Sequence, residues 1–181
     1  MVPVPTDAGL PEAYPKHLEG SFEVRDGRTV WVRAILPSDA ADLADAVERA
    51  DRETLLHRFF TAAPHLTDRQ IHYLAEVDYR RRLALVARDA DGEGVAVARY
   101  ECHPETNIAE VAVAVAPEWR RLGIATELLR RLEDPARENG FEVLDAVYLP
   151  DNHAVARVFE RLGYSSPRIE DGLASVSKAL V

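Results

Sequence analysis

The sequence predicts an α+β fold in which one mixed, mostly antiparallel sheet is flanked by helices. Segments with alternating apolar residues, typical of strands, are interleaved with segments whose apolar residues recur every three to four positions, typical of helices. Asp91-Gly92 joins two of the apolar segments, which predicts a hairpin and hence an antiparallel pair. Along the chain the expected order is one strand, two helices, three antiparallel strands, helix, strand, helix and strand.

The strand segments share a period of two or a short apolar run. They are Thr29–Ile35, Leu83–Arg88, Gly94–Tyr100, Ile108–Ala116, Val143–Leu149 and Ser175–Leu180. The helical segments are expected from Ser38 through Ala50, over Thr54–Phe60, from Thr67 to about Glu76, from about Gly123 toward Asn139, and over Asn152–Leu162. Pro64 breaks the second helical stretch, and Thr67 with Gln70 forms a capping box after it.

Two residues mark the end of the long helix that follows Gly123. Gly140 is expected to end it, because glycine readily adopts the left-handed conformation found after a helix C-terminus. Pro135 lies inside the same helix, where it removes one hydrogen bond and clashes with the preceding turn at a cost of about 3 kcal/mol. We therefore expect a kink or an early break near Asp134.

Length and composition limit the organisation of the chain. At 181 residues it is long enough for one full core and too short for two domains of typical size. The first twenty residues contain four prolines and have little periodicity. We expect residues 1–20 to be a flexible leader that drapes over the surface and residues 21–181 to form a single domain.

Composition also excludes several functional classes. No apolar run is long enough to cross a bilayer and no signal segment follows Met1, so we expect a cytoplasmic protein without a membrane partner. Cys102 is the single cysteine, and no His/Cys cluster indicates a metal. The net charge of -9 argues against nucleic-acid binding. Local positive features would have to hold an anionic ligand.

The stretch from Arg120 to Ala125 supplies such a feature. It leads from an apolar strand into a helix through Gly123, so that main-chain N–H groups and the helix dipole point the same way. Gly123 and Ala125 leave space for phosphate oxygens, while Arg120 and Arg121 add charge. The spacing R-x-x-G-x-A matches neither a Walker loop nor a dinucleotide-binding loop.

This spacing resembles the acyl-CoA pyrophosphate loop of the GNAT N-acetyltransferase superfamily. Val113-Ala114-Val115-Ala116-Pro117 before the loop and Asn152 with Gly163-Tyr164 after it add to the resemblance. It implies the GNAT fold, in which the fourth and fifth strands splay apart and admit the pantetheine arm. It also implies acetyl-CoA as acyl donor, without a metal. The cofactor-binding residues that it implies are Val113, Val115, Arg120, Arg121, Leu122, Gly123, Ile124, Ala125, Thr126 and Asn152.

The resemblance leaves two roles open. Asn152 begins the last helix, where its side chain could cap the helix, contact the CoA arm, or do both. Phe159 occupies the position at which many members carry the tyrosine that protonates the leaving thiolate. Water or Tyr148 could replace that acid, although Tyr148 also fits a packing role.

The reaction needs a proton acceptor, because only about one lysine amine in 2,500 is neutral at pH 7. Glu110 is the candidate general base. It shares a strand face with Ala112 and Ala114, whose small side chains suit an open channel. The alternative is a solvated glutamate near a strand end. His72 and His103 are the histidines considered for the acceptor side, the alternative being ordinary surface residues.

The acceptor is predicted from a finer resemblance to the bacterial protein-lysine acetyltransferase (Pat-like) branch. It is based on Leu55-x-x-Arg58-Phe59-Phe60, Leu66-Thr67-Asp68-Arg69, Val77-Asp78-Tyr79 and Leu83-Ala84-Leu85-Val86-Ala87. The branch acetylates active-site lysines of acyl-CoA synthetases, which implies a protein partner with a reactive lysine. A small primary amine as acceptor and a catalytically weak CoA-binding sensor are the alternatives. A monomer and a homodimer are both compatible with the sequence.

Overall fold

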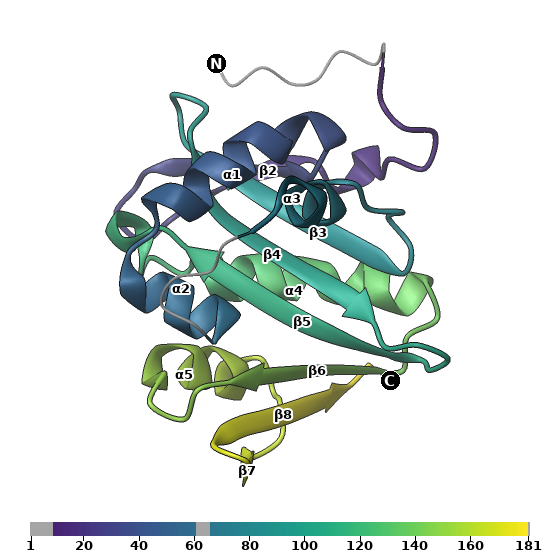
Figure 1. Ribbon diagram of the computed structural model, residues 1–181, viewed down its shortest axis with the longest axis vertical. Coiled ribbons are helices and arrows are strands. Elements are labelled where there is room, and N and C mark those ends of the chain that lie inside the picture. Colours follow the sequence, from purple (N-terminus) through teal and green to yellow (C-terminus); the bar gives the residue numbers. More distant parts are fainter. Residues whose placement is uncertain (1–8, 61–65, 181) are drawn as a thin grey trace.

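One sheet forms the centre of the molecule, with helices on both of its faces (Figure 1). The computed structural model describes residues 9–60 and 66–180, in which eight strands follow the order β1-β2-β3-β4-β5-β6-β8-β7. The strands are β1 (Gly20–Glu23), β2 (Thr29–Ala34), β3 (Arg82–Arg88), β4 (Gly94–Cys102), β5 (Ile108–Val115), β6 (Val143–Tyr148), β7 (Arg168–Glu170) and β8 (Leu173–Ala179). The helices are α1 (Ala40–Arg49), α2 (Arg52–Phe59), α3 (Asp68–Ala75), α4 (Ile124–Glu138) and α5 (His153–Arg161), with 3-10 turns at Lys16–Leu18, Pro37–Asp39 and Pro117–Trp119.

The pairing of the strands confirms the predicted fold class. β5 and β6 run parallel, and the other neighbouring strands pair antiparallel. The sheet is therefore mixed and mostly antiparallel, with the predicted hairpin between β3 and β4.

The strands β5 and β6 splay apart, as the GNAT fold requires. Their register runs from Ile108↔Val143 to Glu110↔Asp145, and among the described residues the pairing ends there. Beyond this point β5 continues for five more residues along β4, while β6 stays paired with β8 and diverges from β5 (Figure 1). We call the pair Glu110 and Asp145, where the two strands separate, the fork.

The larger core lies between the sheet and α4. Leu128, Leu129 and Leu132 recur at helical spacing, are at most 1% exposed, and form the face that packs on β3, β4 and β5. Leu83 and Leu85 of β3 join this core, whereas Ala84 between them joins a smaller core beneath α1 and α3. Because successive strand residues point to opposite faces, the two cores lie on opposite sides of the sheet.

The expected element order needs three corrections. Two strands instead of one precede the helices, since the structure adds β1, which was not predicted. The short strand β7 was also missed. β8 begins at Leu173 instead of Ser175. β1 and β7 are short edge strands whose side chains are mostly exposed, so they carry no clear apolar alternation to detect. Within the described chain, three α-helices instead of two lie between β2 and β3. The predicted break at Pro64 lies outside the described residues.

The early break expected near Asp134 is wrong. α4 continues through Pro135 to Glu138, and Gly140, at φ +85°, follows its end as predicted. Tertiary contacts hold the last turn: the Asn139 side chain donates both to the carbonyl of Pro135 and to the hydroxyl of Tyr100, at 2.8 and 3.0 Å. Ala136 is fully buried beside them. This packing offsets the hydrogen bond that proline removes.

The proposed leader, residues 1–20, stays a prediction, as does the domain at residues 21–181. Of the described residues in this segment, Tyr14 is 9% exposed and stacks edge-on against Tyr79, with ring centroids 5.7 Å apart. Its hydroxyl donates to Glu19 at 2.9 Å. The segment therefore contacts the core at Tyr14.

Truncation of the α4 core face tests this architecture. Leu128→Ala should lower the free energy of unfolding by about 2–5 kcal/mol, because it deletes a side chain with no exposed surface and leaves a cavity. Chemical denaturation followed by circular dichroism measures the change. Ile169→Ala on β7 is the control; its side chain is 56% exposed, so the change should stay within about 0.5 kcal/mol. Equal losses for the two variants would contradict this assignment of the core.

Candidate functional site

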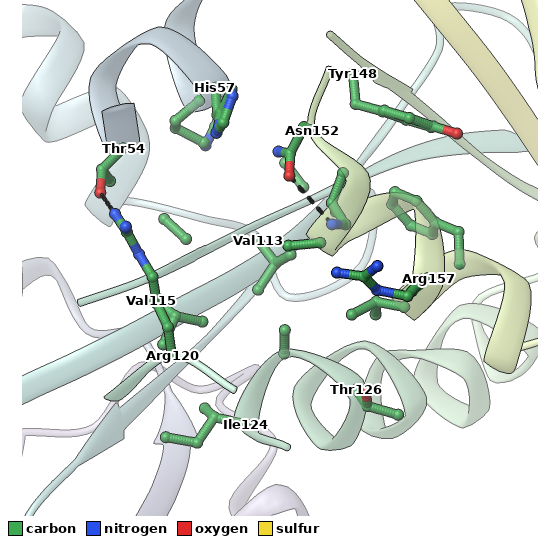
Figure 2. Close-up of a pocket in the computed structure, with 18 of the residues that line it drawn as sticks. Thr54, His57, Val113, Val115, Arg120, Ile124, Thr126, Tyr148, Asn152 and Arg157 are labelled. Atoms are coloured by element: carbon green, nitrogen blue, oxygen red, sulfur yellow. Dashed lines mark hydrogen bonds between the residues drawn. The ribbon is translucent and has the colours of Figure 1, made fainter. Parts of the chain in front are cut away.

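A cavity of about 660 Å³ opens where β5 and β6 have separated, between α2, α4 and α5. Figure 2 shows side chains from all of these elements directed around one space. The residues predicted for the site meet here: Glu110, Val113, Val115, Arg120, Arg121, Gly123, Ile124, Ala125, Thr126 and Asn152 line the cavity. Leu122 does not line it and instead packs against the larger core. The splayed strands thus create the space that the sequence predicted.

The main chain of β5 lies along this space. The N–H of Ala116 donates to the carbonyl of Val95 on β4 at 2.9 Å, which fixes the side to which this residue's main chain points. In an antiparallel pair successive residues direct their N–H and C=O groups to opposite sides. The groups of Val113 and Val115 therefore point away from β4, toward the side that β6 has left, whereas the N–H of Val111 still takes part in the last β5–β6 pair. An extended ligand with amide groups can pair with them as an added strand would.

The turn into α4 forms an anion-binding geometry at one end of the cavity. Arg121 and Gly123 have φ values of +62° and +96°, and together they turn the chain into the helix. The first intrahelical bond runs from the N–H of Glu127 to the carbonyl of Gly123. The N–H groups of Ile124, Ala125 and Thr126 precede it, so no carbonyl of the helix accepts them, and the helix dipole adds positive potential.

Arg120, which was expected to add positive charge for phosphate oxygens, instead contacts acidic residues of the protein itself. Its guanidinium forms ion pairs with Asp51 at 2.9 Å and Glu53 at 2.8 Å, both at the start of α2, and it contacts Thr54 there (Figure 2). Asp51 also caps α2 by accepting the N–H of Thr54 at 2.9 Å. The charge of Arg120 is therefore already paired, and its role in phosphate binding stays a prediction.

Arg25 and two arginines of α5 also line the cavity, and sequence reasoning missed all three. Arg157 and Arg161 lie four residues apart on α5, and neither has a hydrogen bond or ion pair to another residue in the described part of the chain. Figure 2 shows the guanidinium of Arg157 directed into the cavity. The sequence carries a signal for this site, namely two arginines on one face of the helix that follows Asn152. However, only the packing of α5 in the folded chain brings these arginines to the cavity.

Asn152 performs the predicted capping role. Its side-chain oxygen accepts the N–H of Val155 at 3.1 Å, at the first turn of α5. Its amide nitrogen stays available on the side of the cavity, which Asn152 also lines. Contact of this amide with a cofactor stays a prediction.

Tyr148 of β6 and Phe159 of α5 pack together, and both are among the residues that line the cavity. Their ring centroids are 5.8 Å apart, and they are 5% and 3% exposed. Burial raises the pKa of the Tyr148 phenol, and Figure 2 shows its hydroxyl directed away from Val113 and Asn152. This placement favours the packing role of Tyr148 over that of a proton donor.

Glu110 lies at the fork, at the opposite end of β5 from the anion-binding turn. Its side chain stands open to solvent, yet the surrounding protein removes part of its hydration. This desolvation, and then the nearby charge of Asp145, raises the pKa of the Glu110 carboxyl, while His103 and Arg58 act in the opposite direction. A carboxylate with a raised pKa is a better proton acceptor near neutral pH.

The face that Glu110 shares with Ala112 and Ala114 is partly covered. α2 lies over it, and the two alanines line both the main cavity and a smaller one of about 90 Å³ beneath α2. The expected open channel is thus bounded by a helix that carries Arg58 and Phe59.

Neither a metal-binding cluster nor a membrane-spanning helix is found in the part of the chain that the structure describes. Groups of three or more His, Cys, Asp or Glu side chains placed to hold a metal ion do not occur among the described residues. The described helices are also too short or too polar to cross a membrane.

A family model described as "Acetyltransferase (GNAT) family" matches residues 45–164, which include the fork, the turn into α4 and Asn152. The chain belongs to the GNAT acetyltransferase family. The family uses acetyl-CoA, and the chain is therefore an acetyltransferase.

Individual relatives agree with this assignment. The acetyltransferase PA5475 of Pseudomonas aeruginosa is 29% identical over 154 residues, which cover 83% of each chain. The acetyltransferase Pat of Mycolicibacterium smegmatis is 33% identical over 144 residues, 78% of this chain but only 43% of that protein. The chain thus spans less than half the length of that relative.

A solved structure matches over almost the whole molecule. The crystal structure of the GNAT domain of S. lividans PAT superimposes with a TM-score of 0.84 at 31% identity, covering 92% of this chain and 99% of the other. The predicted GNAT fold, and the resemblance to the Pat-like branch, are thereby confirmed.

Two substitutions at Asn152 separate its two roles. Asn152→Ala should destabilise the protein by about 1 kcal/mol through loss of the cap, whereas Asn152→Asp keeps the capping oxygen and most of the stability. If the amide also contacts the donor, both variants should bind acetyl-CoA more weakly. Thermal unfolding and calorimetric titration measure the two effects. Wild-type affinity in Asn152→Asp would limit Asn152 to capping.

Proposed function

We propose that the protein transfers the acetyl group of acetyl-CoA to the Nε of a protein lysine, of the kind found in acyl-CoA synthetases, with Glu110 as general base. The observation that carries the proposal is the position of Glu110 at the fork, at one end of the unpaired edge of β5. The anion-binding turn lies at the other end. Five residues of strand separate Glu110 from Val115, about 17 Å at the usual rise.

This separation supports a definite orientation of the donor. The turn into α4 and the α5 arginines fit the phosphates, and the edge of β5 fits the amides of the pantetheine arm. The thioester then lies toward Glu110. The N–H of Val111 is still engaged in the Glu110↔Asp145 pairing, so the first N–H of this edge that β6 leaves unpaired is that of Val113, the candidate donor for the negative charge that develops on the thioester oxygen.

The chemistry is direct attack. The ammonium group of the acceptor gives one proton to Glu110, and the neutral amine nitrogen then forms a bond to the thioester carbon. The C–S bond breaks as CoA leaves with its electron pair, and the thiolate takes up the second proton that the nitrogen loses. Recovering the neutral amine from the dominant ammonium is equivalent to about 4.6 kcal/mol at pH 7. Because the pKa of Glu110 is raised, it lies closer to the pKa of the amine. The proton transfer from the amine to the carboxylate is therefore less unfavourable.

A protein acceptor is supported by exposure and by the relatives. Glu110 is open to solvent, so a lysine on the surface of another protein can reach it. The name Pat of the M. smegmatis relative and of the S. lividans domain points the same way. A small primary amine is the second candidate, favoured by the carboxylates Glu101 and Asp145 that flank Glu110 in the sheet.

Turnover assays distinguish these acceptors. Thiol release from acetyl-CoA should be measured with an acyl-CoA synthetase and with a panel of polyamines, amino acids and aminoglycosides. Release with the synthetase, together with lysine acetylation detected by mass spectrometry, is the expected outcome. Release only with a small amine would replace the protein acceptor. Acetyl-CoA binding without turnover on either class would indicate a sensor.

Glu110→Gln should lower turnover at least tenfold while leaving acetyl-CoA affinity almost unchanged. The substitution removes the proton acceptor, a contribution of about 10²–10⁴-fold for general base catalysis, but keeps the shape of the side chain. Initial rates and calorimetric titration provide the two measurements. Glu48→Gln, on the exposed side of α1, is the control and should retain wild-type turnover. Unchanged turnover in Glu110→Gln would remove Glu110 from the mechanism.

Arg157→Gln should weaken acetyl-CoA binding by about tenfold, because it removes one charge-assisted contact to a phosphate worth about 1.5 kcal/mol. The loss should shrink at high salt, where the charge is screened. Calorimetric titration at two ionic strengths tests both points. Arg168→Gln on β7, away from the cavity, is the matched control. An unchanged dissociation constant would show that Arg157 does not contact the donor.

A further inference from the structure

Three carboxylates stand in one row across the sheet at the fork. Glu101 of β4 is the partner of Glu110 in the register of β4 with β5, and Asp145 of β6 is its partner on the other side. Partners in register point to the same face, and neighbouring strands lie about 4.8 Å apart. Ionised carboxylates at this spacing repel each other, and each disfavours ionisation of the next.

The two outer members of the row have partners, and the middle one does not. The hydroxyl of Tyr73, from α3, donates to Glu101. The Nε2 atom of His103 lies 3.1 and 3.0 Å from the two carboxylate oxygens of Asp145. The Glu110 carboxylate forms no hydrogen bond or ion pair with any other residue in the described ranges 9–60 and 66–180. Its oxygens are therefore free to accept a proton from a bound amine.

The charged groups around Glu110 come from every element at the fork. They are Glu101 from β4, Asp145 from β6, His103 from the turn between β4 and β5, and Arg58 from α2. Of these, Asp145 and His103 touch each other but not the cavity that holds the donor. They can thus act on Glu110 without contacting the acyl donor.

We propose that His103 and Asp145, in contact with each other, act as positioning residues for Glu110 and together set the pH range in which Glu110 accepts the proton of the acceptor amine. The inference rests on the proposed function, because it assumes that Glu110 is the base. Asp145 places a negative charge beside Glu110 and so strengthens it as a base. The imidazole of His103 limits that effect by binding both oxygens of Asp145.

The sign of each effect follows from the charges. Asp145 raises the pKa of Glu110 and His103 lowers it. Catalysis requires ionised Glu110, so activity rises with pH through this pKa. Asp145→Asn should therefore move the acidic limb of the pH–rate profile to lower pH, and His103→Gln should move it to higher pH. A purely structural role would reduce activity without moving the limb in opposite directions.

Two measurements test the proposal on the full chain. The first follows the carboxyl ¹³C signals of labelled glutamate by NMR during a pH titration, with Glu110→Gln identifying the Glu110 signal; it needs no acceptor. The second is the pH profile of kcat/KM for acetylation. The midpoint of the NMR titration and that of the acidic limb of the kcat/KM profile should both shift by about half a pH unit or more. The shift should be downward in Asp145→Asn and upward in His103→Gln. Side chains that are 33% and 40% exposed should tolerate these near-isosteric changes.

His17→Gln is the control. His17 is an exposed histidine on the 3-10 turn Lys16–Leu18, which packs near β2 and not near the fork, so the substitution should leave both curves in place. Unshifted curves in both test variants, or shifts in the same direction, would overturn the proposal. The NMR shifts could be opposite while Glu110→Gln keeps full turnover. That result would support the influence of His103 and Asp145 on Glu110 but overturn Glu110 as the base. The two measurements therefore distinguish a failure of this inference from a failure of the proposed function.

Discussion

The pairing of β5 with β6 ends after Glu110 and Asp145, and the arrangement of the site depends on this short register. Each further pair would have closed the sheet and satisfied the main chain of Val113 and Val115 within the fold. Because β6 follows β8 instead, these polar groups need another partner, and they line a cavity that can hold one. The register also places Asp145 beside Glu110, so the feature that opens the donor site creates the environment of the proposed base.

Charge is distributed unevenly in a chain whose net charge is -9. Arginines and the N-terminus of α4 line the cavity, while carboxylates gather at the fork. This separation suits a reaction between an anionic donor and a cationic acceptor. Arg58 is the exception, since it lies on the acceptor side, and burial lowers its pKa although Glu110 and Glu101 oppose that shift.

The parts of the site that are local in sequence could be predicted. The turn from Arg120 to Ala125 combines a strand, a glycine and a helix within a few residues, and Asn152 lies directly before the helix that it caps. The splay was expected from the family resemblance alone. These features need no knowledge of distant contacts.

The parts that depend on distant segments could not be predicted. His103 and Asp145 are 42 residues apart, and only the β5–β6 register brings them together. The arginines of α5 enter the site through the packing of that helix. α4 passes through Pro135 because Tyr100 and Asn139 hold its last turn, and the edge strands β1 and β7 lack apolar alternation. In each case tertiary contacts decide what local propensity leaves open.

The ion pairs of Arg120 with Asp51 and Glu53 have an energetic consequence for the donor. A phosphate that engages this guanidinium competes with two carboxylates, so the observed affinity reports a difference between two sets of contacts. Asp51 also caps α2, the helix that carries Arg58 over the acceptor side. The proposed phosphate contact of Arg120 would therefore link donor occupancy to the stability of α2, and by reciprocity anything that anchors α2 from the acceptor side would change the affinity for the donor by the same factor.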